Sequence, residues 1–469
     1  EITGSVIFGY STLDDLNKKY KVEEANKIFD SNDIAETIRA KTIVDSGNEF
    51  KRVYILKLSR GTDIKKAAQE YSSLTEVEYA EPNYLYSTNR VPDDLRYNQQ
   101  WAHQDTAIEK AWDNETGNPD IVIAIIDSGI DYTHEDLSDN IWINRLEDIN
   151  KNKKFDNFPV YTGGDLDLID NDNNGFVDDV VGYDFVDIEK EKYTLVELQD
   201  YEDYESIDNN PSDKAGHGTH VAGIVAAVTN NEGGIAGVCW RCKLMPIRSG
   251  FATFTGVSLE SDDIAVAIKY ATDNDAQIIS MSFRGEYSNL LQDVITYAHS
   301  RKTILIAAAG NDARNFIVYP AGYDDVISVA ATDENEQRAV FSNYGYWIDV
   351  AAPGVDILST MPNGEYEKLS GTSMAAPYVS GLAGLILSRN PSISPEEVKQ
   401  IIKHTTDTPI SDEYIGTGRV NTFKALQVNQ IPITTTKIVS PPNGALILSS
   451  GGTLDIIGIA SGNYRVEYG

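Results

Sequence analysis

The feature of the sequence that most constrains the fold is a pair of uninterrupted apolar runs. Residues 121–126 read Ile-Val-Ile-Ala-Ile-Ile, and residues 303–309 read Thr-Ile-Leu-Ile-Ala-Ala-Ala. A strand without a polar face must be buried on both sides, which is typical of a parallel sheet covered by helices. Helical patterns such as residues 262–271 lie between the runs. The alternation predicts an α/β fold with a doubly wound, mostly parallel sheet and a functional site at the carboxyl ends of its strands.

The length of the chain indicates more than one domain, because 469 residues exceed what a single hydrophobic core usually supports. We expect the α/β domain at residues 91–429, preceded by a small α+β unit at residues 1–90. A polar stretch at 87–94 has the composition of a linker between them. Residues 430–469 alternate like strands between turns, and we expect them to be the truncated start of a β-rich domain.

The α+β unit is predicted from four short patterns. A helix is expected at 63–71, and strands are expected at 5–10, 51–58 and 77–86.

The charge of the chain narrows the class of partner. Its formal net charge is −33, which argues against nucleic-acid binding because phosphate contacts need basic patches. The excess of negative charge suits binding of cations such as Ca²⁺. Acidic residues concentrate in an insertion at residues 147–213, which holds 20 Asp or Glu against 5 Lys or Arg. The sequence contains no apolar run long enough to span a bilayer.

The two cysteines, Cys239 and Cys242, are three residues apart. Two thiols cannot form a disulfide framework or a four-ligand zinc site. A local disulfide and a pair of buried thiols both remain open.

Asp127 and His217 occupy unusual settings. Asp127 ends the first apolar run, where an ionised carboxylate is costly unless it is paired, although a helix N-cap is an equal alternative. His217 stands between two glycines before an apolar helical pattern, so backbone closes round it. His220 follows three residues later, and a zinc pair is the weaker interpretation because no third ligand stands at matching spacing.

Ser373 and Asn311 complete the set. Ser373 precedes an apolar helical pattern, where a helix N-terminus offers N–H groups to a developing oxyanion, although a Ser there is more often a cap. Asn311 follows the second apolar run and is either a turn residue or an amide donor. Together they predict that His217 accepts the proton of Ser373 while Asp127 orients the imidazole. Asn311 and the backbone N–H of Ser373 would bind the oxyanion.

Four segments carry a resemblance to a known family. They are residues 127–130, 216–223, 309–311 and 371–377. Their order and spacing resemble the subtilisin-like serine proteases, or subtilases, on the thermitase-like side of that family. The resemblance covers roughly residues 92–428 and implies a secreted serine endopeptidase that acts through an acyl-enzyme.

The resemblance also assigns the N-terminal unit. Residues 1–90 are similar to the inhibitory propeptide of the family, which implies a ferredoxin-like fold and a zymogen. Self-cleavage is then expected within residues 87–91, with the released segment still occupying the cleft. The implied partners are peptide substrates and the chain's own propeptide, the implied state is a monomer, and the signal peptide would be absent from this chain.

Further resemblance concerns substrate binding. Residues 278–285 are similar to the strand that lines the substrate cleft, where Arg284 replaces the usual Gly. We hypothesise that Arg284 biases the cleft toward acidic or polar side chains. Val318 replaces a small residue at the floor of the main specificity pocket, which predicts a shallow pocket. The full set expected to bind substrate is Ser282, Phe283, Arg284, Gly285, Ala309, Gly310 and Val318.

Two calcium sites are expected. The pattern at 170–179 places oxygen-bearing side chains at alternate positions before a Gly turn, like the first half of an EF-hand loop, although Val181 stands where the closing Glu would be. A solvated acidic loop is the alternative. The expected ligands of this first calcium site are Asp170, Asp172, Asn174, the carbonyl of Phe176, Asp178 and Asp179. Resemblance alone implies the second site, with ligands Asp94, Asp136, Thr229, Asn231, Gly233 and Ile235.

The sequence therefore predicts a secreted, calcium-dependent serine endopeptidase in its proform. A catalytically silent binding protein on the same fold, or a zymogen that never activates, is the alternative. A metallohydrolase that uses His217 and His220 is a weaker third hypothesis.

Overall fold

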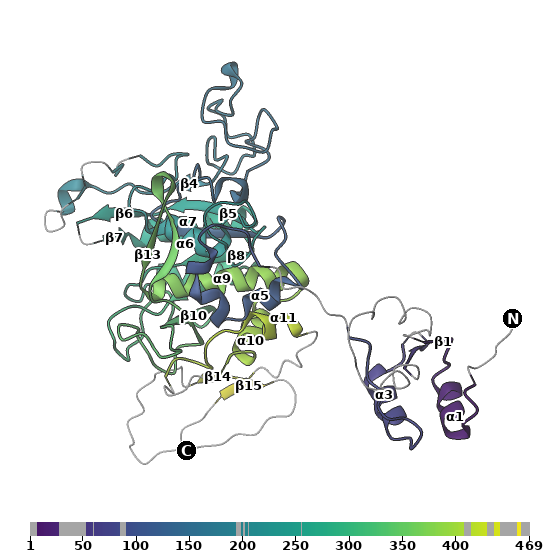
Figure 1. Cartoon of the computed structure of the whole chain (residues 1–469). Coiled ribbons are helices and arrows are strands. Elements are labelled where there is room, and N and C mark those ends of the chain that lie inside the picture. The colour runs from purple at the N-terminus through teal and green to yellow at the C-terminus, as the bar shows by residue number, and fades with distance from the viewer. Residues whose placement is uncertain are drawn as a thin grey trace, which may run out of the picture. The chain divides into compact units, whose positions relative to one another are not determined.

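The computed structural model of the chain describes residues 7–27, 53–59, 61–84, 91–193, 198–199, 202–204, 206–254, 256–407, 414–428, 436–440 and 457–460. The chain divides into two compact units, Glu1–Thr88 and Asn89–Gly469 (Figure 1).

In the smaller unit the structure describes two helices and two strands. Its elements are α1 (Ser11–Lys19), β1 (Glu24–Lys27), β2 (Tyr54–Lys57) and α3 (Ile64–Ser72). The strands pair antiparallel, and Asp63 caps α3 by accepting a hydrogen bond from the Lys66 N–H at 3.0 Å. The predictions of a strand at 51–58 and a helix at 63–71 are confirmed.

The strand predictions at 5–10 and 77–86 are wrong for the residues that the structure describes. Residues 7–10 and 77–84 lie outside any strand. The Phe8 and Gly9 N–H groups donate to the Asp14 carboxylate of α1, at 2.6 and 3.1 Å, instead of to a strand. Ile7 and Tyr79 are 71% and 58% exposed, so the alternating pattern does not reflect a covered face.

The larger unit is built on a sheet of seven strands in the order β11-β10-β9-β8-β3-β5-β4. Every neighbouring pair is parallel, which confirms the predicted fold class. The strands are β3 (Val122–Asp127), β4 (Tyr183–Asp184), β5 (Lys243–Arg248), β8 (Ile278–Met281), β9 (Ile304–Ala308), β10 (Val326–Thr332) and β11 (Val350–Pro353).

Helices and short hairpins complete this unit. The helices are α4 (Trp101–Asp105), α5 (Ile108–Trp112), α6 (His217–Ala226), α7 (Ser261–Asp273), α8 (Asn289–Ser300), α9 (Thr372–Arg389), α10 (Pro395–His404) and α11 (Thr422–Gln427). Antiparallel pairs form between β6 (Gly250–Thr253) and β7 (Gly256–Leu259), between β12 (Ile357–Met361) and β13 (Glu365–Leu369), and between β14 (Thr436–Ser440) and β15 (Ile457–Ala460).

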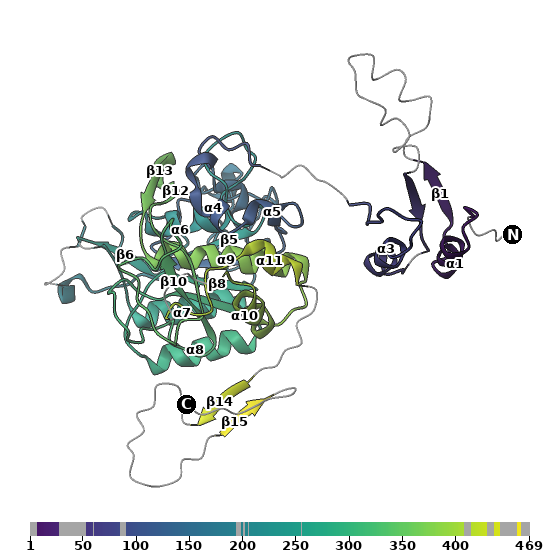
Figure 2. The same cartoon turned by 60° about the horizontal axis from the view of Figure 1, so that its bottom comes forward.

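The sheet is covered on both faces, which explains its apolar runs. In β3, Ile123 and Ile125 belong to the core that includes α6 and α9. The alternate residues, Val122, Ala124 and Ile126, belong to the core that includes α7 and α8. Figure 2 shows α9 on one side of the sheet and α8 on the other. A polar residue on either face of this strand would therefore be buried.

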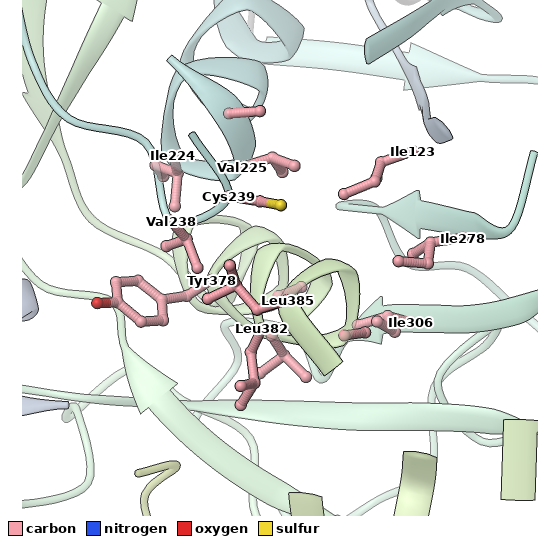
Figure 3. Close-up of a cluster of buried hydrophobic side chains, with 14 of the residues drawn as sticks. Ile123, Ile224, Val225, Val238, Cys239, Ile278, Ile306, Tyr378, Leu382 and Leu385 are labelled. Atoms are coloured by element: carbon pink, nitrogen blue, oxygen red, sulfur yellow. The ribbon is translucent and has the colours of Figure 1, made fainter. Parts of the chain in front are cut away.

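Helix α9 lies at the centre of the first core. Its side chains Leu382 and Leu385 belong to the same core as Ile123, Ile278 and Ile306, which come from three adjacent strands (Figure 3). Because the helix begins at Thr372, this packing fixes the position of its first turn relative to the strand ends.

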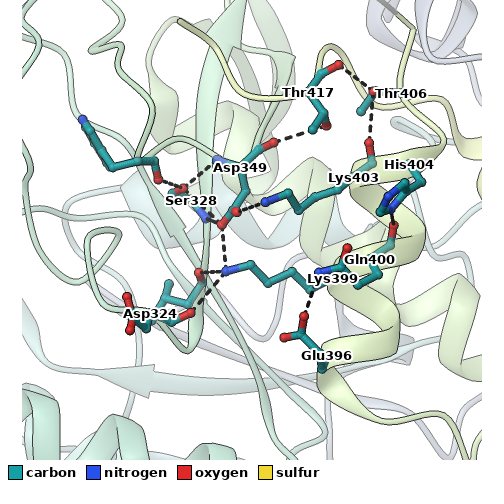
Figure 4. A network of polar contacts seen from close by, with 12 residues as sticks. Asp324, Ser328, Asp349, Glu396, Lys399, Gln400, Lys403, His404, Thr406 and Thr417 are labelled. Atoms are coloured by element: carbon teal, nitrogen blue, oxygen red, sulfur yellow. Dashed lines mark hydrogen bonds and ion pairs between the residues drawn. The ribbon is translucent and has the colours of Figure 1, made fainter. Parts of the chain in front are cut away.

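A buried ion network ties α10 to the sheet. The Asp349 carboxylate, just before β11, accepts hydrogen bonds from Lys403 Nζ at 2.8 Å and the Ser328 N–H at 3.1 Å (Figure 4). Lys399 Nζ lies 3.0 Å from the same carboxylate. Burial opposes the charge on Asp349, but the two lysines outweigh it and lower the pKa of this carboxyl below its ordinary value.

Cys239 and Cys242 form a disulfide that packs against α9. A Cβ on Gly384 would lie 2.8 Å from the Cys242 sulfur, so this helical position requires a glycine. None of the helices that the structure describes is long and apolar enough to cross a membrane.

Candidate active site

The carboxyl edge of the sheet gathers the segments that follow β3, β8 and β9, because these three parallel strands are neighbours. Asp127 ends β3, Ser282 follows β8 and Asn311 follows β9 by three residues. Helix α9 begins at Thr372 beside them, since the Thr372 N–H donates to Asn311 Oδ1 at 2.9 Å. The predicted residues therefore share one edge.

Asp127 and His217 are in direct contact. His217 Nδ1 donates to Asp127 Oδ1 at 2.7 Å. The Asp127 side chain is 3% exposed, whereas the imidazole is 27% exposed. Burial opposes the imidazolium, but the charge of Asp127 and its hydrogen bond outweigh that effect and raise the pKa of His217 above its ordinary value. The remaining ring nitrogen, Nε2, is left to take a proton.

Two glycines allow this contact. A Cβ on Gly218 would lie 2.1 Å from the Gly129 carbonyl oxygen and 3.1 Å from Asp127 Cβ. Gly129 has φ +97°, and a Cβ there would lie 2.5 Å from the Pro211 carbonyl oxygen. The first turn of α6 can approach the end of β3 only because neither position carries a side chain.

A buried carboxylate that the sequence reasoning missed, Asp213, fixes this arrangement. Its Oδ1 accepts hydrogen bonds from Ser128 Oγ at 2.9 Å and the Gly216 N–H at 2.8 Å. Its Oδ2 accepts from the Thr219 N–H at 2.9 Å and the Thr219 hydroxyl at 2.7 Å. Asp213 thus joins the Asp127 turn to the start of α6. Its position just before the glycine-flanked His217 is the signal that could have found it.

Ser373 lies in the first turn of α9. Its Oγ donates to the Ser282 carbonyl oxygen at 3.0 Å, and Ser282 Oγ donates to the Ser373 carbonyl oxygen at 3.0 Å. Within the described residues no hydrogen bond joins Ser373 to His217. The hydroxyl must turn from Ser282 toward the imidazole before it can pass on its proton.

The Asn311 amide nitrogen and the Ser373 backbone nitrogen border one space. Asn311 Oδ1 accepts from both the N–H and the hydroxyl of Thr372, each at 2.9 Å, which leaves Nδ2 facing the other way. A Cβ built on Gly371 would lie 3.4 Å from Asn311 Nδ2 and 3.6 Å from the Ser373 N. Because both donors border this side-chain-free space, an oxygen atom there could accept from both.

His220 points away from this site. Its Nε2 lies 3.0 Å from the Ile357 carbonyl oxygen and 3.1 Å from that of Glu367. Burial lowers the pKa of His220 to about 4. Among the described residues no potential metal cluster contains a histidine, so the structure gives no support to a His217–His220 zinc pair.

The residues expected to line the cleft lie on neighbouring segments. The Gly285 N–H donates to the Tyr319 carbonyl oxygen at 2.7 Å, which brings the segment after β8 beside the buried Val318. Phe283 packs against the second core.

Asn343 bonds to Ala309 and Gly310, two further residues that were expected to line the cleft and that follow β9. Its Nδ2 donates to the Ala309 carbonyl oxygen at 2.9 Å, and its backbone N–H donates to the Gly310 carbonyl oxygen at 2.9 Å.

Arg284 has a partner that the sequence reasoning missed. Its guanidinium donates to Asp312 Oδ1 at 2.8 Å. A Cβ on Gly310 would lie 2.8 Å from Arg284 Cδ, so the arginine stem crosses over this glycine. The ion pair joins the segments that follow β8 and β9.

Two buried carboxylates predicted as calcium ligands, Asp94 and Asp136, both contact the loop at 230–235. Asp136 accepts from Asn231 Nδ2 at 2.7 Å and the Ile235 N–H at 2.8 Å, and Asp94 accepts from the Asn230 N–H at 3.2 and 3.1 Å. Burial raises the pKa of Asp94 to about 6 and also raises that of Asp136. Within the described residues neither carboxylate forms an ion pair, and such a site fits a hard cation.

Two other residues expected at this site make protein contacts. The Thr229 hydroxyl donates to the Ala227 carbonyl at 3.0 Å, and the Gly233 carbonyl accepts from the Leu95 N–H at 3.1 Å.

The acidic insertion forms a different carboxylate set from the one predicted. Glu147, Asp172 and Asp179 bring carboxylate oxygens within 4.8 Å of one another. Asn174 Nδ2 donates to Asp172 at 3.1 Å and to Asp179 at 2.9 Å. Glu147 is fully buried and its Oε2 has no hydrogen-bond partner among the described residues. Burial raises the pKa of Asp179 to about 7. An oxygen-preferring cation fits this set.

Two predicted carboxylate ligands, Asp170 and Asp178, lie outside that set. Asp170 accepts from the N–H groups of Asn174 and Gly175, at 3.1 and 2.8 Å, and shapes the turn. Asp178 accepts from the N–H groups of Asp167 and Leu168. The Phe176 ring packs on Tyr270, with 5.0 Å between ring centroids. Glu147 lies far from this loop in sequence, so the spacing of residues in the loop could not predict it as a ligand.

Comparisons with known proteins agree with this geometry. The family model described as Subtilase family matches residues 118–421, and the one described as Fervidolysin N-terminal prodomain matches residues 4–83.

Individual relatives extend the match. Thermophilic serine proteinase of Bacillus sp. (strain AK1) is 34% identical over 392 residues, which are 83% of this chain and 82% of that protein. Thermitase of Thermoactinomyces vulgaris is 35% identical over 335 residues, covering 70% of this chain and 96% of that protein. A solved structure, described as proteases from Pseudoalteromonas arctica PAMC 21717, matches with a TM-score of 0.57 and 30% identity, over 72% of this chain and 98% of that one.

Proposed function

This chain belongs to the subtilase family and is a serine protease with an N-terminal prodomain, and we propose that Ser373 is its nucleophile, with His217 and Asp127 as its proton-transfer pair. The observation that carries the proposal is the 2.7 Å hydrogen bond between Asp127 and His217 at the strand edge where α9 presents Ser373. This bond holds the imidazole with Nε2 free to act as a base.

In the proposed reaction the Ser373 oxygen attacks the carbonyl carbon of a peptide bond while its proton passes to His217 Nε2. The imidazolium is stabilised by Asp127, which stays ionised, and it then gives the proton to the leaving amine nitrogen. Water hydrolyses the resulting ester by the same steps in reverse, which returns the hydroxyl to Ser373.

The oxyanion that develops in both steps would occupy the space beside Gly371. Asn311 Nδ2 and the Ser373 backbone nitrogen border that space. They lie 3.4 and 3.6 Å from the position that a Cβ on Gly371 would take. Donors fixed in advance stabilise developing charge without reorganising during the reaction.

The N-terminal unit is proposed to inhibit the enzyme until it is removed. A prodomain model matches residues 4–83, and the compact unit ends at Thr88. Self-cleavage within residues 87–91 would separate the unit from the catalytic domain, for which we propose residues 91–429, with a further β-rich segment at 430–469.

Calcium is the proposed metal at both carboxylate sites. One uses Asp94, Asp136 and the loop at 229–235, and the other uses Glu147, Asp172 and Asp179. Buried carboxylates without ion pairs explain why an oxygen-preferring cation would stabilise this fold.

The remaining proposals concern location, assembly and specificity. The Cys239–Cys242 disulfide suits an oxidising environment, which supports secretion, and we propose a monomer.

The ion pair with Asp312 offsets part of the positive charge of Arg284, so we expect only a modest preference for acidic or polar substrate side chains. Cleavage rates on peptides that differ only at that side chain test this point, and Val318 predicts slow cleavage after Phe or Tyr.

A serine-directed phosphonyl fluoride tests the assignment of the nucleophile. After incubation of the chain with Ca²⁺, peptide mapping should locate the adduct on Ser373, and labelling should be far slower in His217→Ala. Ser370→Ala, a change at a nearby serine, should label like the parent. Proteolysis by a chain whose Ser373 stays unlabelled would refute the assignment.

A further inference from the structure

Three carboxylates form a cluster separate from the two calcium sites proposed above. Asp187, Glu260 and Asp263 each offer an oxygen, and these oxygens lie within 4.8 Å of one another. Asp187 lies in the loop after β4, within the acidic insertion. Glu260 is the N-cap of α7 and Asp263 lies in its first turn. The cluster thus joins the insertion to a helix that covers the sheet.

The buried member of the cluster, Asp263, has a carboxylate oxygen without a hydrogen-bond partner among the described residues. Asp263 is 5% exposed, and the oxygen in question is its Oδ2. Acidic side chains at an N-cap and three residues later usually accept hydrogen bonds from helix N–H groups. Here the Glu260 side chain makes no capping bond. The two carboxylates approach each other instead, although like charges repel.

The surroundings add negative charge. Burial, together with the charges of Asp262, Asp187 and Glu260, raises the pKa of Asp263 to about 8. In the part of the chain that the structure describes, no Lys, Arg or His forms an ion pair with any of the three. Arg248, the buried arginine that ends β5, is paired with Asp184 and with Glu202, the latter at 2.6 Å. Protonation of Asp263 would neutralise only one carboxylate.

We propose that Asp187, Glu260 and Asp263 bind a divalent cation, Ca²⁺, which fastens the acidic insertion to the start of α7. Calcium–oxygen distances of about 2.3–2.6 Å place two ligands of one ion at most about 5 Å apart, which the observed spread satisfies. Asp187 is exposed, so water can complete the coordination on its side. The Tyr193 hydroxyl donates to Glu260 and holds that carboxylate in place.

Ion counting tests the proposal without relying on activity. The full chain carrying Ser373→Ala is dialysed against Ca²⁺, and the bound ions per chain and their dissociation constants are measured by calorimetry and elemental analysis. Asp263→Asn and Asp187→Asn are compared with Asp262→Asn, which removes a charge from the neighbouring exposed position outside the cluster. Asp187 is exposed, so its substitution keeps the test valid even if Asp263→Asn impairs folding.

We expect Asp187→Asn and Asp263→Asn each to weaken one binding event by at least about ten-fold, since even outer-shell changes cost that much. Asp262→Asn should retain that event, and so should Glu147→Gln, which alters the separate site in the insertion. Tb³⁺ in place of Ca²⁺ should give luminescence excited through Tyr193, and Tyr193→Phe should reduce it. Equal ion counts and affinities in all variants would overturn the proposal, as would an equal loss in Asp262→Asn.

Discussion

At the scale of single residues, the site depends on side chains that orient other side chains. Asp127 orients His217, Thr372 orients the Asn311 amide, and Asp213 joins the turn after β3 to the start of α6. Each of these contacts is buried or half-buried, where a hydrogen bond is electrostatically stronger than in water. Catalytic competence should therefore be sensitive to changes that leave the nucleophile itself intact.

Asn311→Ala removes one of the two proposed oxyanion donors. We expect kcat to fall by about 10² to 10³-fold, the loss found for the corresponding change in subtilisin, with little change in KM. Steady-state kinetics on a peptide substrate measure this. An unchanged kcat would show that Asn311 does not meet the developing charge.

The pH profile tests the Asp127–His217 pair. Because the pKa of His217 is raised above its ordinary value, kcat/KM should increase with pH and reach half of its plateau above pH 6.5. Asp127→Asn removes the charge that raises the pKa, so the midpoint should move to lower pH and the rate should fall by about 10⁴-fold. A midpoint that stays in place would contradict the pairing.

The residue level also shows how far sequence reasoning reaches. Asp127, His217, Asn311 and Ser373 each follow a strand or open a helix, so pattern alone could place them on one edge. Asp213 and Glu147 could not be found this way, because their partners are backbone N–H groups and distant carboxylates that only the folded chain brings near. The strand pattern failed over residues 77–84, which the structure describes, because alternation does not require a covered face.

At the scale of elements, buried charge holds secondary structure to the sheet. The carboxylates of Glu147, Asp172 and Asp179 in the acidic insertion have no cationic side-chain partner among the described residues, whereas the Asp349 carboxylate that holds α10 has two lysines. The first set should respond to metal and the second to pH.

Removal of metal tests the insertion. At a free Ca²⁺ concentration about one hundred times Kd, one site contributes about 2.7 kcal/mol to stability. In the Ser373→Ala background we therefore expect chelator to lower the melting temperature markedly. Glu147→Gln should reduce that difference, and Glu334→Gln, at an exposed position outside the insertion, should not. Equal melting temperatures with and without chelator would contradict both calcium sites.

The α10 network makes a prediction for acid stability. Asp349→Asn leaves Lys399 and Lys403 without their buried carboxylate and should cost about 3 kcal/mol at neutral pH. Because the folded pKa of Asp349 is lowered, its contribution is complete above the unfolded pKa and is lost as pH falls through the folded pKa. The gap between parent and variant in urea unfolding should therefore shrink below about pH 4. Asp275→Asn, at an exposed position, is the control, and a gap that persists in acid would argue against the network.

At the scale of the whole molecule, the chain combines a catalytic domain with a unit that matches a prodomain. The apolar runs were sufficient to predict the parallel sheet, because a strand buried on both faces has few alternatives.

Self-cleavage of the purified chain tests the central claim most directly. Intact-mass measurement after incubation with Ca²⁺ should show a cut within residues 87–91 in the parent and in Ser370→Ala, and no cut in Ser373→Ala. Cleavage that persists in Ser373→Ala, or a parent chain that stays whole and inactive toward peptides, would contradict the account of this chain as the zymogen of a serine endopeptidase.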